Sequence, residues 1–482
     1  MEMLDRDLLS IQEARILIEK AKKAQEKLKT FPQEILDKFS LSLIECIEKN
    51  LEGIVEKYLE ENPCGNKTDK LIRNKYLLSK LKEIVKTQRC VGILQEDKEK
   101  KTCEIGVPLG VVVAFSKNYN SLESIIYNLI VAIKTGNSIV FSIDLKGKEI
   151  LEDVINKLTQ LGQEVGIPKD TFGYLKNYSV CGEKELINHR YTTLIINNGC
   201  EKLIDIVKQS GKKYIYGTQG NGPVFIERSA DVEKAVEDII FSKTFDNGTL
   251  PGAEQEIIID GPIKDTVENI LKEKGCYFLN EEQSEKLKNI LFDEKGKFNG
   301  EFIGKTPQFI GELIGVHLGE NIKIIVIPEK FVAHDRTYEK EILSPIIPVC
   351  VEDDWKEACE RCIELLLGEK VGHTMVIHSQ DEEVIKEFAL KKPVGRILVN
   401  TSGVLGTMGG TTNLFPSTII SFDNISPKDF IYIRKVAFET VDKEEFLKGL
   451  GYNKDKEKLK GKELLFEFIR ELLKKVNTEV KE

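Results

Sequence analysis

The sequence lacks the features that would place this chain in a membrane or on a nucleic acid. It has no apolar run of membrane length, and residues 1–30 alternate charged and apolar residues where a signal peptide would have an apolar h-region. Positive charge is not in excess, because the charged residues, 31% of the total, mix both signs and the net charge is -9. This balance disfavours a polyanion-binding surface. We expect a cytoplasmic globular protein of two or three domains, with no nucleic-acid partner and no membrane partner.

Cysteine is present ten times, yet the sequence shows no convincing metal-binding pattern. Only Cys359 and Cys362 have the close CxxC spacing, and they fall within a helical pattern over Trp355–Leu367. A helix is the main interpretation of that pair, and a redox or metal role is the alternative. We expect the cysteines to be small buried apolar residues, and we expect no metal site.

One loop has a residue order typical of an active-site loop but contains no nucleophile. Residues 245–255 read Phe-Asp-Asn-Gly-Thr-Leu-Pro-Gly-Ala-Glu-Gln, without Cys, Ser or His. The loop follows a predicted helix over Asp231–Phe241 and precedes a predicted strand over Glu256–Asp260. A reaction that needs a nucleophile at this loop would therefore require a side chain from elsewhere in the chain.

Hydrophobic periodicity predicts an α/β fold. Residues 10–88 have a helical pattern, with Ile16, Ile18, Ala21 and Ala24 on one stripe. A strand over Gly110–Phe115, a helix over Ser124–Thr135 and a strand over Ser138–Ser142 then form a βαβ unit. The alternation continues through a helix at 149–161, a strand at 192–196, a helix at 202–210 and a strand at 213–217. This order is typical of a doubly wound nucleotide-binding domain.

A second α/β unit is predicted after Gly217, and an amphipathic segment closes the chain. The further predicted strands lie at 220–226, 256–260, 322–327, 346–351, 374–378 and 396–400. Residues 451–462 are polar and linker-like, and the segment 463–476 carries one apolar stripe at helical spacing, formed by Leu464, Leu465, Phe468, Ile469, Leu472, Leu473 and Val476. We divide the chain into residues 1–242, 243–425, 426–450 and 451–482.

The order of short motifs resembles the coenzyme A-acylating aldehyde dehydrogenases, of the acetaldehyde and propionaldehyde type. The motifs are Pro108 with Gly110-Val-Val, Asn120, Asn128, Gly136-Asn137, Gly220-Asn-Gly-Pro-Val, Phe245-Asp-Asn-Gly, Glu254, Glu341-Ile-Leu-Ser-Pro, Gly372-His-Thr, Val399-Asn400 and Gly406 with Gly409-Gly410. The resemblance implies a Rossmann-like NAD domain (residues 1–242), an α/β catalytic domain (243–425) and an oligomerisation arm. It also implies a reaction in which a cysteine thiolate attacks an aldehyde, hydride passes to NAD and coenzyme A releases the acyl group.

The resemblance assigns roles to individual residues. It makes Asn120 the side-chain donor to the oxyanion, and it places Glu254 three residues after the nucleophile position. The cofactor-binding residues that it implies are Asp144, Gly199, Gly220, Asn221 and Glu341. The family cysteine falls where Pro251 stands, and proline supplies neither a nucleophile nor a backbone N–H.

Three departures bear on the cofactor and the acyl group. Asn197-Asn198-Gly199 replaces a Thr-Gly-Gly turn beneath the pyrophosphate. Asp144-Leu145 replaces a His-Pro pair near the adenosine ribose, and a carboxylate there favours NAD over NADP. Near Phe422-Asp423-Asn424 the family's Gly-Glu-Gly segment is missing.

The glycine-rich segment and two histidines each allow a structural and a functional interpretation. The glycine-rich residues 403–410 predict a turn, with a phosphate cradle as the alternative. His373 and His378 flank a predicted strand and are interpreted as structural, with a base or a ligand as the alternative.

Two functional hypotheses follow. In the first, the protein is a pseudoenzyme that assembles with, regulates or scaffolds an active paralogue or a compartment. In the second, it is an oxidoreductase that acts on an aldehyde or acyl-CoA without covalent catalysis. A homo-oligomer is expected. The carboxy-terminal helix resembles the encapsulation peptides that dock family members onto bacterial microcompartment shell proteins, and packing on its own subunit or in a dimer is the alternative.

Overall fold

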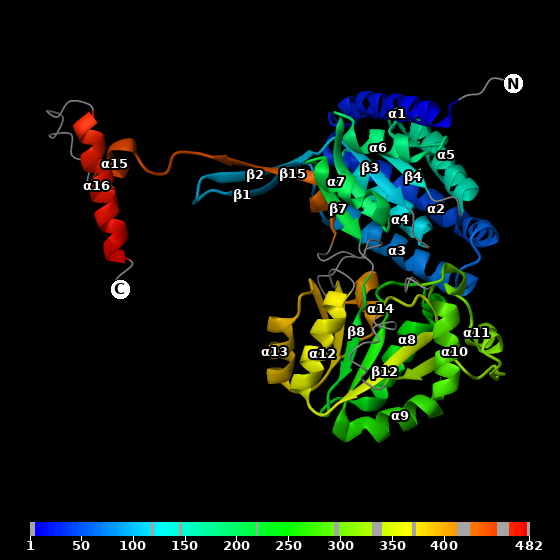
Figure 1. The fold of residues 1–482 in the computed structure, drawn as a ribbon. Helices are drawn as coiled ribbons and strands as arrows, with labels where there is room; N and C mark the ends of the chain where they lie inside the picture. Colours follow the sequence, from blue (N-terminus) through cyan, green and yellow to red (C-terminus); the bar gives the residue numbers. More distant parts are fainter. Residues whose placement is uncertain are drawn as a thin grey trace. The chain divides into compact units, whose positions relative to one another are not determined.

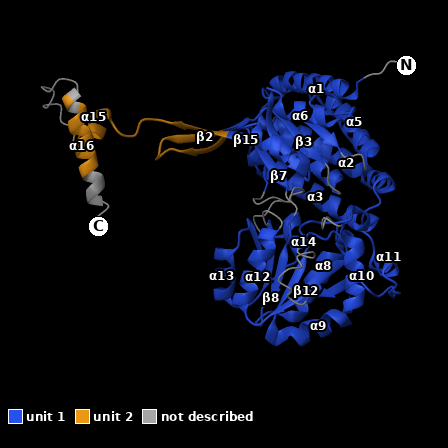
Figure 2. Ribbon diagram, in the orientation of Figure 1, with its two compact units in different colours: residues 1–92, 106–432 blue, residues 93–105, 433–482 orange. Residues whose placement is uncertain are grey.

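The protein forms two compact units in a computed structural model (Figures 1 and 2). The structure describes residues 5–116, 120–143, 147–217, 220–293, 298–329, 340–368, 373–411, 425–450 and 462–479. Unit 1 comprises residues 1–92 and 106–432, and unit 2 comprises residues 93–105 and 433–482. The finer division at residues 242, 425 and 450 stays a prediction.

Three long helices open unit 1, as the helical periodicity predicts. They are α1 (Arg6–Leu28), α2 (Gln33–Glu61) and α3 (Lys67–Thr87). Asp5 caps α1 and Asn66 caps α3, because each side chain accepts hydrogen bonds from backbone N–H groups of the first turn. The buried stripe of α1 contains Ala14, Ile18, Ala21 and Ala24. Ile16, which we expected on this stripe, is 43% exposed.

A five-stranded parallel sheet follows, in the order β5-β4-β3-β6-β7. Its strands are β3 (Val111–Ser116), β4 (Ser138–Ile143), β5 (Phe172–Tyr174), β6 (Thr192–Asn198) and β7 (Lys213–Gly217). The helices between them are α4 (Ser121–Lys134), α5 (Lys148–Val165), α6 (Val180–Asn188) and α7 (Ile204–Gln209). This is the doubly wound order in which ligands bind where the strand order reverses, here between β3 and β6.

Both faces of this sheet are covered, which explains the continuous apolar runs of its strands. Val112 and Ala114 of β3 face a core shared with α2, α4 and α5. Val111, Val113 and Phe115 face the opposite core, shared with α1 and α6. Alternate side chains of one strand therefore belong to two hydrophobic clusters.

The second sheet of unit 1 has seven parallel strands in the order β10-β11-β12-β9-β8-β13-β14. The strands are β8 (Pro223–Ile226), β9 (Glu256–Asp260), β10 (Cys276–Phe278), β11 (Ile324–Pro328), β12 (Ile346–Glu352), β13 (Thr374–His378) and β14 (Arg396–Val399). Its helices are α8 (Val232–Thr244), α9 (Lys264–Glu273), α10 (Glu281–Leu291), α11 (Pro307–Leu313), α12 (Trp355–Gly368), α13 (Glu382–Lys391) and α14 (Gly403–Leu405). The loop of residues 245–255 joins α8 to β9.

Unit 2 contains a three-stranded sheet and two helices. The sheet has the order β1-β2-β15, from β1 (Gly92–Asp97), β2 (Thr102–Pro108) and β15 (Ile431–Ala437). The helices are α15 (Lys443–Gly449) and α16 (Lys462–Glu479). Helix α16 confirms the predicted carboxy-terminal helix, while the side chains of Leu464 and Val476 lie outside the described residues. Among the described helices, none combines the length and apolarity needed to cross a membrane.

Candidate functional site

The loop of residues 245–255 begins with a tight turn over Phe245–Gly248. Asp246 and Asn247 both have left-handed backbone angles, with φ of 51° and 52°. This conformation is uncommon for residues other than glycine, so the surroundings must hold it. Gly248 has no such cost, but a Cβ there would lie 2.8 Å from the carbonyl oxygen of Ser344. Pro251 is half-buried, and residues 252–255 are buried.

Asn120, for which the resemblance implies the role of oxyanion donor, contacts this loop. It is the residue before α4, and its side-chain Nδ2 donates to the carbonyl oxygen of Thr249 at 3.1 Å. Its Oδ1 accepts from Nη1 of Arg73 at 2.7 Å. The structure therefore brings Asn120 to a point two residues before Pro251.

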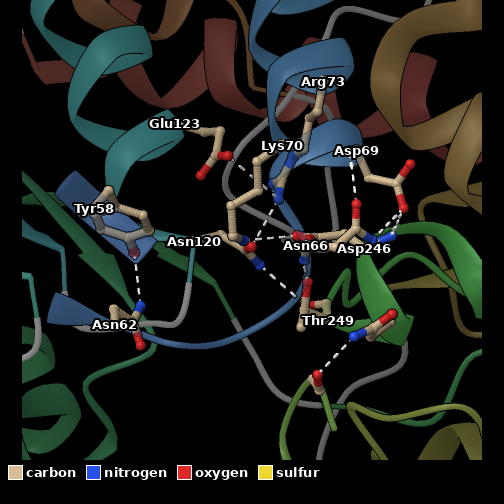
Figure 3. A network of polar contacts seen from close by, with 12 residues as sticks. Tyr58, Asn62, Asn66, Asp69, Lys70, Arg73, Asn120, Glu123, Asp246 and Thr249 are labelled. Atoms are coloured by element: carbon tan, nitrogen blue, oxygen red, sulfur yellow. Dashed lines mark hydrogen bonds and ion pairs between the residues drawn. The ribbon is translucent and has the colours of Figure 1, made fainter. Parts of the chain in front are cut away.

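A polar face of α3 also holds the loop, and the sequence reading missed it (Figure 3). Lys70 Nζ contacts Asp246 Oδ2 at 2.8 Å. The backbone N–H of Asn66 donates to Asp246 Oδ1, and the backbone N–H of Asp246 donates to Asp69 Oδ2. Asn66, Asp69, Lys70 and Arg73 are spaced by three or four residues, which places them on one side of a helix. That spacing of polar residues was the available signal, although α3 carries many other charged residues as well.

Glu254 is a fully buried residue of the loop. Its Oε1 accepts from the backbone N–H of Gly403 at 2.7 Å. Burial raises the pKa of Glu254 to about 7, against hydrogen bonds from Ser242 and Gly403 that favour the charged form. The glycine-rich residues 403–410 form α14 and a following turn, so this N–H binds a carboxylate of the protein.

Lys243, which sequence reasoning also missed, links Gln255 with Ile342, the residues that follow Glu254 and Glu341 in the chain. Its Nζ donates to Oε1 of Gln255 at 3.2 Å and to the carbonyl oxygen of Ile342 at 2.8 Å. Burial lowers the pKa of Lys243 to about 7, while the charges of Glu254 and Glu341 act to raise it. The predicted ribose ligand Glu341 thus directly precedes Ile342, which Lys243 joins to Gln255 of the loop.

The predicted nucleotide residues fall in two places. Gly199 follows β6 at the point where the strand order reverses, and its φ of 80° gives an open turn there. Beside it, Asn198 Nδ2 donates to Ser124 Oγ of α4 at 3.2 Å. Asp144 lies outside the described residues. The strand order and the Gly199 turn fit a dinucleotide, and the Asn198 contact joins β6 to α4 at this point.

Gly220 and Asn221 adjoin Gly222, which contacts the loop. They precede β8 of the seven-stranded sheet, and the backbone N–H of Gln255 donates to the carbonyl oxygen of Gly222 at 2.9 Å. Asn221 is fully buried.

His373, His378 and the CxxC pair are buried. Burial lowers the pKa of His373 to about 3 and that of His378 to about 4, so both rings are neutral at pH 7. Cys359 and Cys362 lie buried on α12. The described residues contain no group of three or more side chains suited to hold a metal ion.

The chain belongs to the aldehyde dehydrogenase family, which its residues 7–276 match. Two solved structures are similar over nearly the whole chain. A probable aldehyde dehydrogenase from Listeria monocytogenes EGD-e is 34% identical with a TM-score of 0.87, covering 92% of this chain and 100% of that one. An acetylating aldehyde dehydrogenase from Geobacillus thermoglucosidasius is 32% identical with a TM-score of 0.86, covering 91% and 99%. The family recognised in the sequence and the predicted fold are both confirmed.

The chain spans about half the length of the first curated relatives that it matches. The bifunctional aldehyde-alcohol dehydrogenase of Escherichia coli is 27% identical over 443 residues, which are 89% of this chain and 50% of that protein. The resemblance therefore concerns part of a larger protein in that case.

Proposed function

We propose that this protein retains the binding site of a coenzyme A-acylating aldehyde dehydrogenase but has lost the covalent step, and that it acts as a pseudoenzyme that regulates or scaffolds an active relative or an assembly. The observation that carries this proposal is Pro251. The residue lies in the loop that Asn120 contacts, and it offers neither a thiol nor an N–H. Loss of a nucleophile that acts as part of a unit costs on the order of 10⁶ in rate, and loss of one oxyanion donor costs about 3 kcal/mol.

Four buried thiols are poorly suited to replace the missing one. Burial raises the pKa of Cys90 to about 11 and that of Cys276 to about 12, and it also raises the pKa of Cys350 and of Cys362 above the usual value of a thiol. The thiolate is the nucleophilic form, so these four groups are weak nucleophiles near pH 7. Cys64 is buried in an apolar cluster with Ile303 and Leu343.

The ligands of the proposed site are NAD and coenzyme A or its thioesters. Two solved structures of the same fold are each 23% identical to this chain. One holds NADP+ and the other holds coenzyme A. In this chain Glu341 would contact the nicotinamide ribose and Gly199 would lie beneath the pyrophosphate. Bound NAD would supply the hydride acceptor.

Turnover by two variants at position 251 tests the proposal. We expect no coenzyme A-dependent NADH formation from short aldehydes by the native chain, and measurable formation by Pro251→Cys. Pro251→Ala is the matched control, because it restores the backbone N–H without a thiol, and it should stay inactive. Native turnover comparable with that of an ordinary family member would overturn the pseudoenzyme proposal.

An active oxidoreductase without covalent catalysis is the second candidate. It is supported by Asn120, which contacts the loop, by Glu254 within the loop, and by Glu341, whose charge acts on Lys243, although the loop has no thiol. Native turnover that Pro251→Ala retains would favour this candidate. Calorimetry with NAD and coenzyme A separately then measures whether either ligand binds.

We further propose that α16 recruits a partner, such as a microcompartment shell protein, and that the three-stranded sheet of unit 2 joins subunits of a homo-oligomer. The support for recruitment is apolar surface: Leu465, Ile469 and Leu473 of α16 are each at least 44% exposed. One solved structure of the fold, at 23% identity, comes from a bacterial microcompartment. The matching location is the cytoplasm, within such a compartment.

Deletion of residues 451–482 tests the recruitment. A fluorescent fusion of the full chain should co-localise with shell proteins, and the deleted form should not. Unchanged localisation would exclude targeting by this helix, and a changed oligomeric state would favour packing between subunits.

A further inference from the structure

Arg73 binds the side chain that the site would use to bind a carbonyl oxygen. Its Nη1 donates to Asn120 Oδ1 at 2.7 Å, and both side chains are nearly inaccessible, with 8% of Arg73 and 2% of Asn120 exposed. A hydrogen bond from a charged donor is stronger than a neutral one, and burial strengthens it further. The contact is therefore a principal constraint on the Asn120 amide.

This constraint fixes which way the amide faces. Guanidinium groups have donors and no acceptor, so Arg73 must meet the oxygen of the amide and not its nitrogen. The nitrogen then faces the loop, where one N–H is taken by the carbonyl oxygen of Thr249. A primary amide has two N–H groups. The second N–H of Asn120 has no acceptor within the described part of the chain.

Arg73 is itself held in place by α4. Its Nη1 lies 3.7 Å from Oε1 of the buried Glu123, which also accepts from Asn74 Nδ2 at 2.9 Å. Burial alone would raise the pKa of Glu123, yet the charges of Arg73 and Lys70 bring it below its usual value. Glu123 is therefore an anion that balances the guanidinium.

Thr249, whose carbonyl oxygen accepts from the Asn120 amide, is held in place by separate contacts. Asp246 Oδ2 accepts from Thr249 Oγ1 at 2.7 Å and from Lys70 Nζ at 2.8 Å. The carbonyl group of Thr249 thus has a defined position relative to α3, the helix that also carries Arg73. Both hydrogen-bonded ends of the Asn120 amide are anchored to one helix.

We propose that Arg73 is a positioning residue, which holds the Asn120 amide so that its second N–H donates to the carbonyl oxygen of a bound acyl thioester or aldehyde. The inference rests on the proposed function, because it needs a carbonyl ligand at the loop. Proline at position 251 has no N–H to share this task, so carbonyl recognition depends on Asn120 more than it would with any other residue there. Without Arg73 the amide can turn and present its oxygen, which repels a carbonyl oxygen.

A comparison of acetyl-CoA with coenzyme A by calorimetry on the full chain tests the proposal. The two ligands differ only at the sulfur, where acetyl-CoA carries an acetyl group in place of the thiol hydrogen of coenzyme A. We expect Arg73→Met and Asn120→Ala each to weaken acetyl-CoA binding about tenfold, as the loss of one charge-supported hydrogen bond implies. Coenzyme A binding should stay within about twofold of native. The double variant should bind acetyl-CoA no worse than Asn120→Ala alone, because Arg73 acts through Asn120.

A spectroscopic measurement separates positioning from a general structural role. The infrared stretch of a ¹³C-labelled acetyl carbonyl should fall in frequency on binding to the native chain, and less so in Arg73→Met. Arg73→Lys keeps a cation and should recover part of the shift. Arg361→Met is the matched control: Arg361 is similarly buried, at 10% side-chain exposure, and pairs with Glu256, so its loss should leave the shift unchanged.

The outcomes distinguish this inference from the proposed function. Equal loss of acetyl-CoA and coenzyme A binding in Arg73→Met, or additive losses in the double variant, would overturn the positioning role. If the native chain bound neither ligand, the proposed function would fail, and the ¹⁵N side-chain amide signal of Asn120 would still decide the positioning. That signal should be sharp in the native chain and broadened in Arg73→Met; an unchanged signal would refute the inference.

Discussion

Lys70 and Asp246 form an ion pair of 2.8 Å, between Nζ and Oδ2, in which neither side chain is exposed to solvent. Asp246 also accepts from the backbone N–H of Asn66 at 2.9 Å and from Thr249 Oγ1 at 2.7 Å, so both of its oxygens are satisfied. Burying two charges is costly unless such additional hydrogen bonds are present. This pair joins α3 to the loop and holds Asp246 in its left-handed conformation.

Lys70→Met should therefore destabilise the fold severely. The substitution leaves the Asp246 carboxylate buried without its cation, and breaking a buried pair in this way costs about 3–5 kcal/mol. The free energy of unfolding from a denaturant titration checks this. The double variant Lys70→Met/Asp246→Asn should recover part of the loss, since the unpaired charge is then gone.

Lys234→Met is the control for that variant. Lys234 pairs with Asp238 on the surface of α8, where its side chain is 51% exposed. Exposed pairs contribute about 1 kcal/mol or less, so this change should be nearly neutral. Equal effects of Lys70→Met and Lys234→Met would show that the buried pair does not organise the loop.

Glu254 should give the protein a specific pH dependence. Burial raises its pKa from 4.5 to about 7, so the folded chain keeps a proton that the unfolded chain releases between those values. The folded state then binds more protons, and this group's contribution to stability is lost as the pH rises from about 4.5 through 7. Lys243 faces Glu254, but its pKa is lowered from 10.5 to about 7, so its own contribution changes above pH 7.

Glu254→Gln removes this component because the amide stays neutral. We expect the melting temperature of the variant, relative to native, to rise steadily as the pH is raised from 4.5 to 7. Calorimetric melting at several pH values measures the difference. A difference that stays constant over this range would contradict the assignment of the raised pKa to Glu254.

The sequence predicted those strands whose burial produces a recognisable run of apolar residues. Continuous apolar runs identified β3 and β4, because both faces of the five-stranded sheet are covered. The strands β5 (Phe172–Tyr174) and β10 (Cys276–Phe278) were missed, since three residues at a sheet edge are too few to show a period.

The candidate site was predictable only in part. A family motif order drew attention to Asn120 and to the loop, and the structure brings them together. Lys70 was missed because its partner Asp246 lies 176 residues further along the chain, and no local pattern encodes that pairing. The one sequence signal was a row of polar residues at helical spacing on α3, which by itself also describes a solvated helix face.

Asn198→Gly should strengthen NAD binding. The Asn198 side chain donates to Ser124 Oγ at 3.2 Å across the crevice where the strand order reverses. Closer backbone approach to a pyrophosphate requires this side chain to be absent or displaced. We expect about fivefold tighter binding by calorimetry, as the release of one hydrogen bond implies. Ser124→Ala removes only the contact and should give a smaller gain; unchanged affinity in both variants would place the dinucleotide elsewhere.

Gly65→Ala should disrupt the same network as loss of Lys70, by a steric route. Gly65 has a left-handed φ of 81°, and a Cβ there would lie 1.9 Å from Asp246 Oδ1. The backbone strain and the forced displacement of Asp246 together should cost roughly 2–5 kcal/mol. Gly211→Ala isolates the backbone term, because Gly211 has a φ of 67° and open space around the added carbon. It should cost about 1 kcal/mol, and a Gly65→Ala effect no larger than this would mean that Asp246 can leave the Lys70 pair without consequence for the fold.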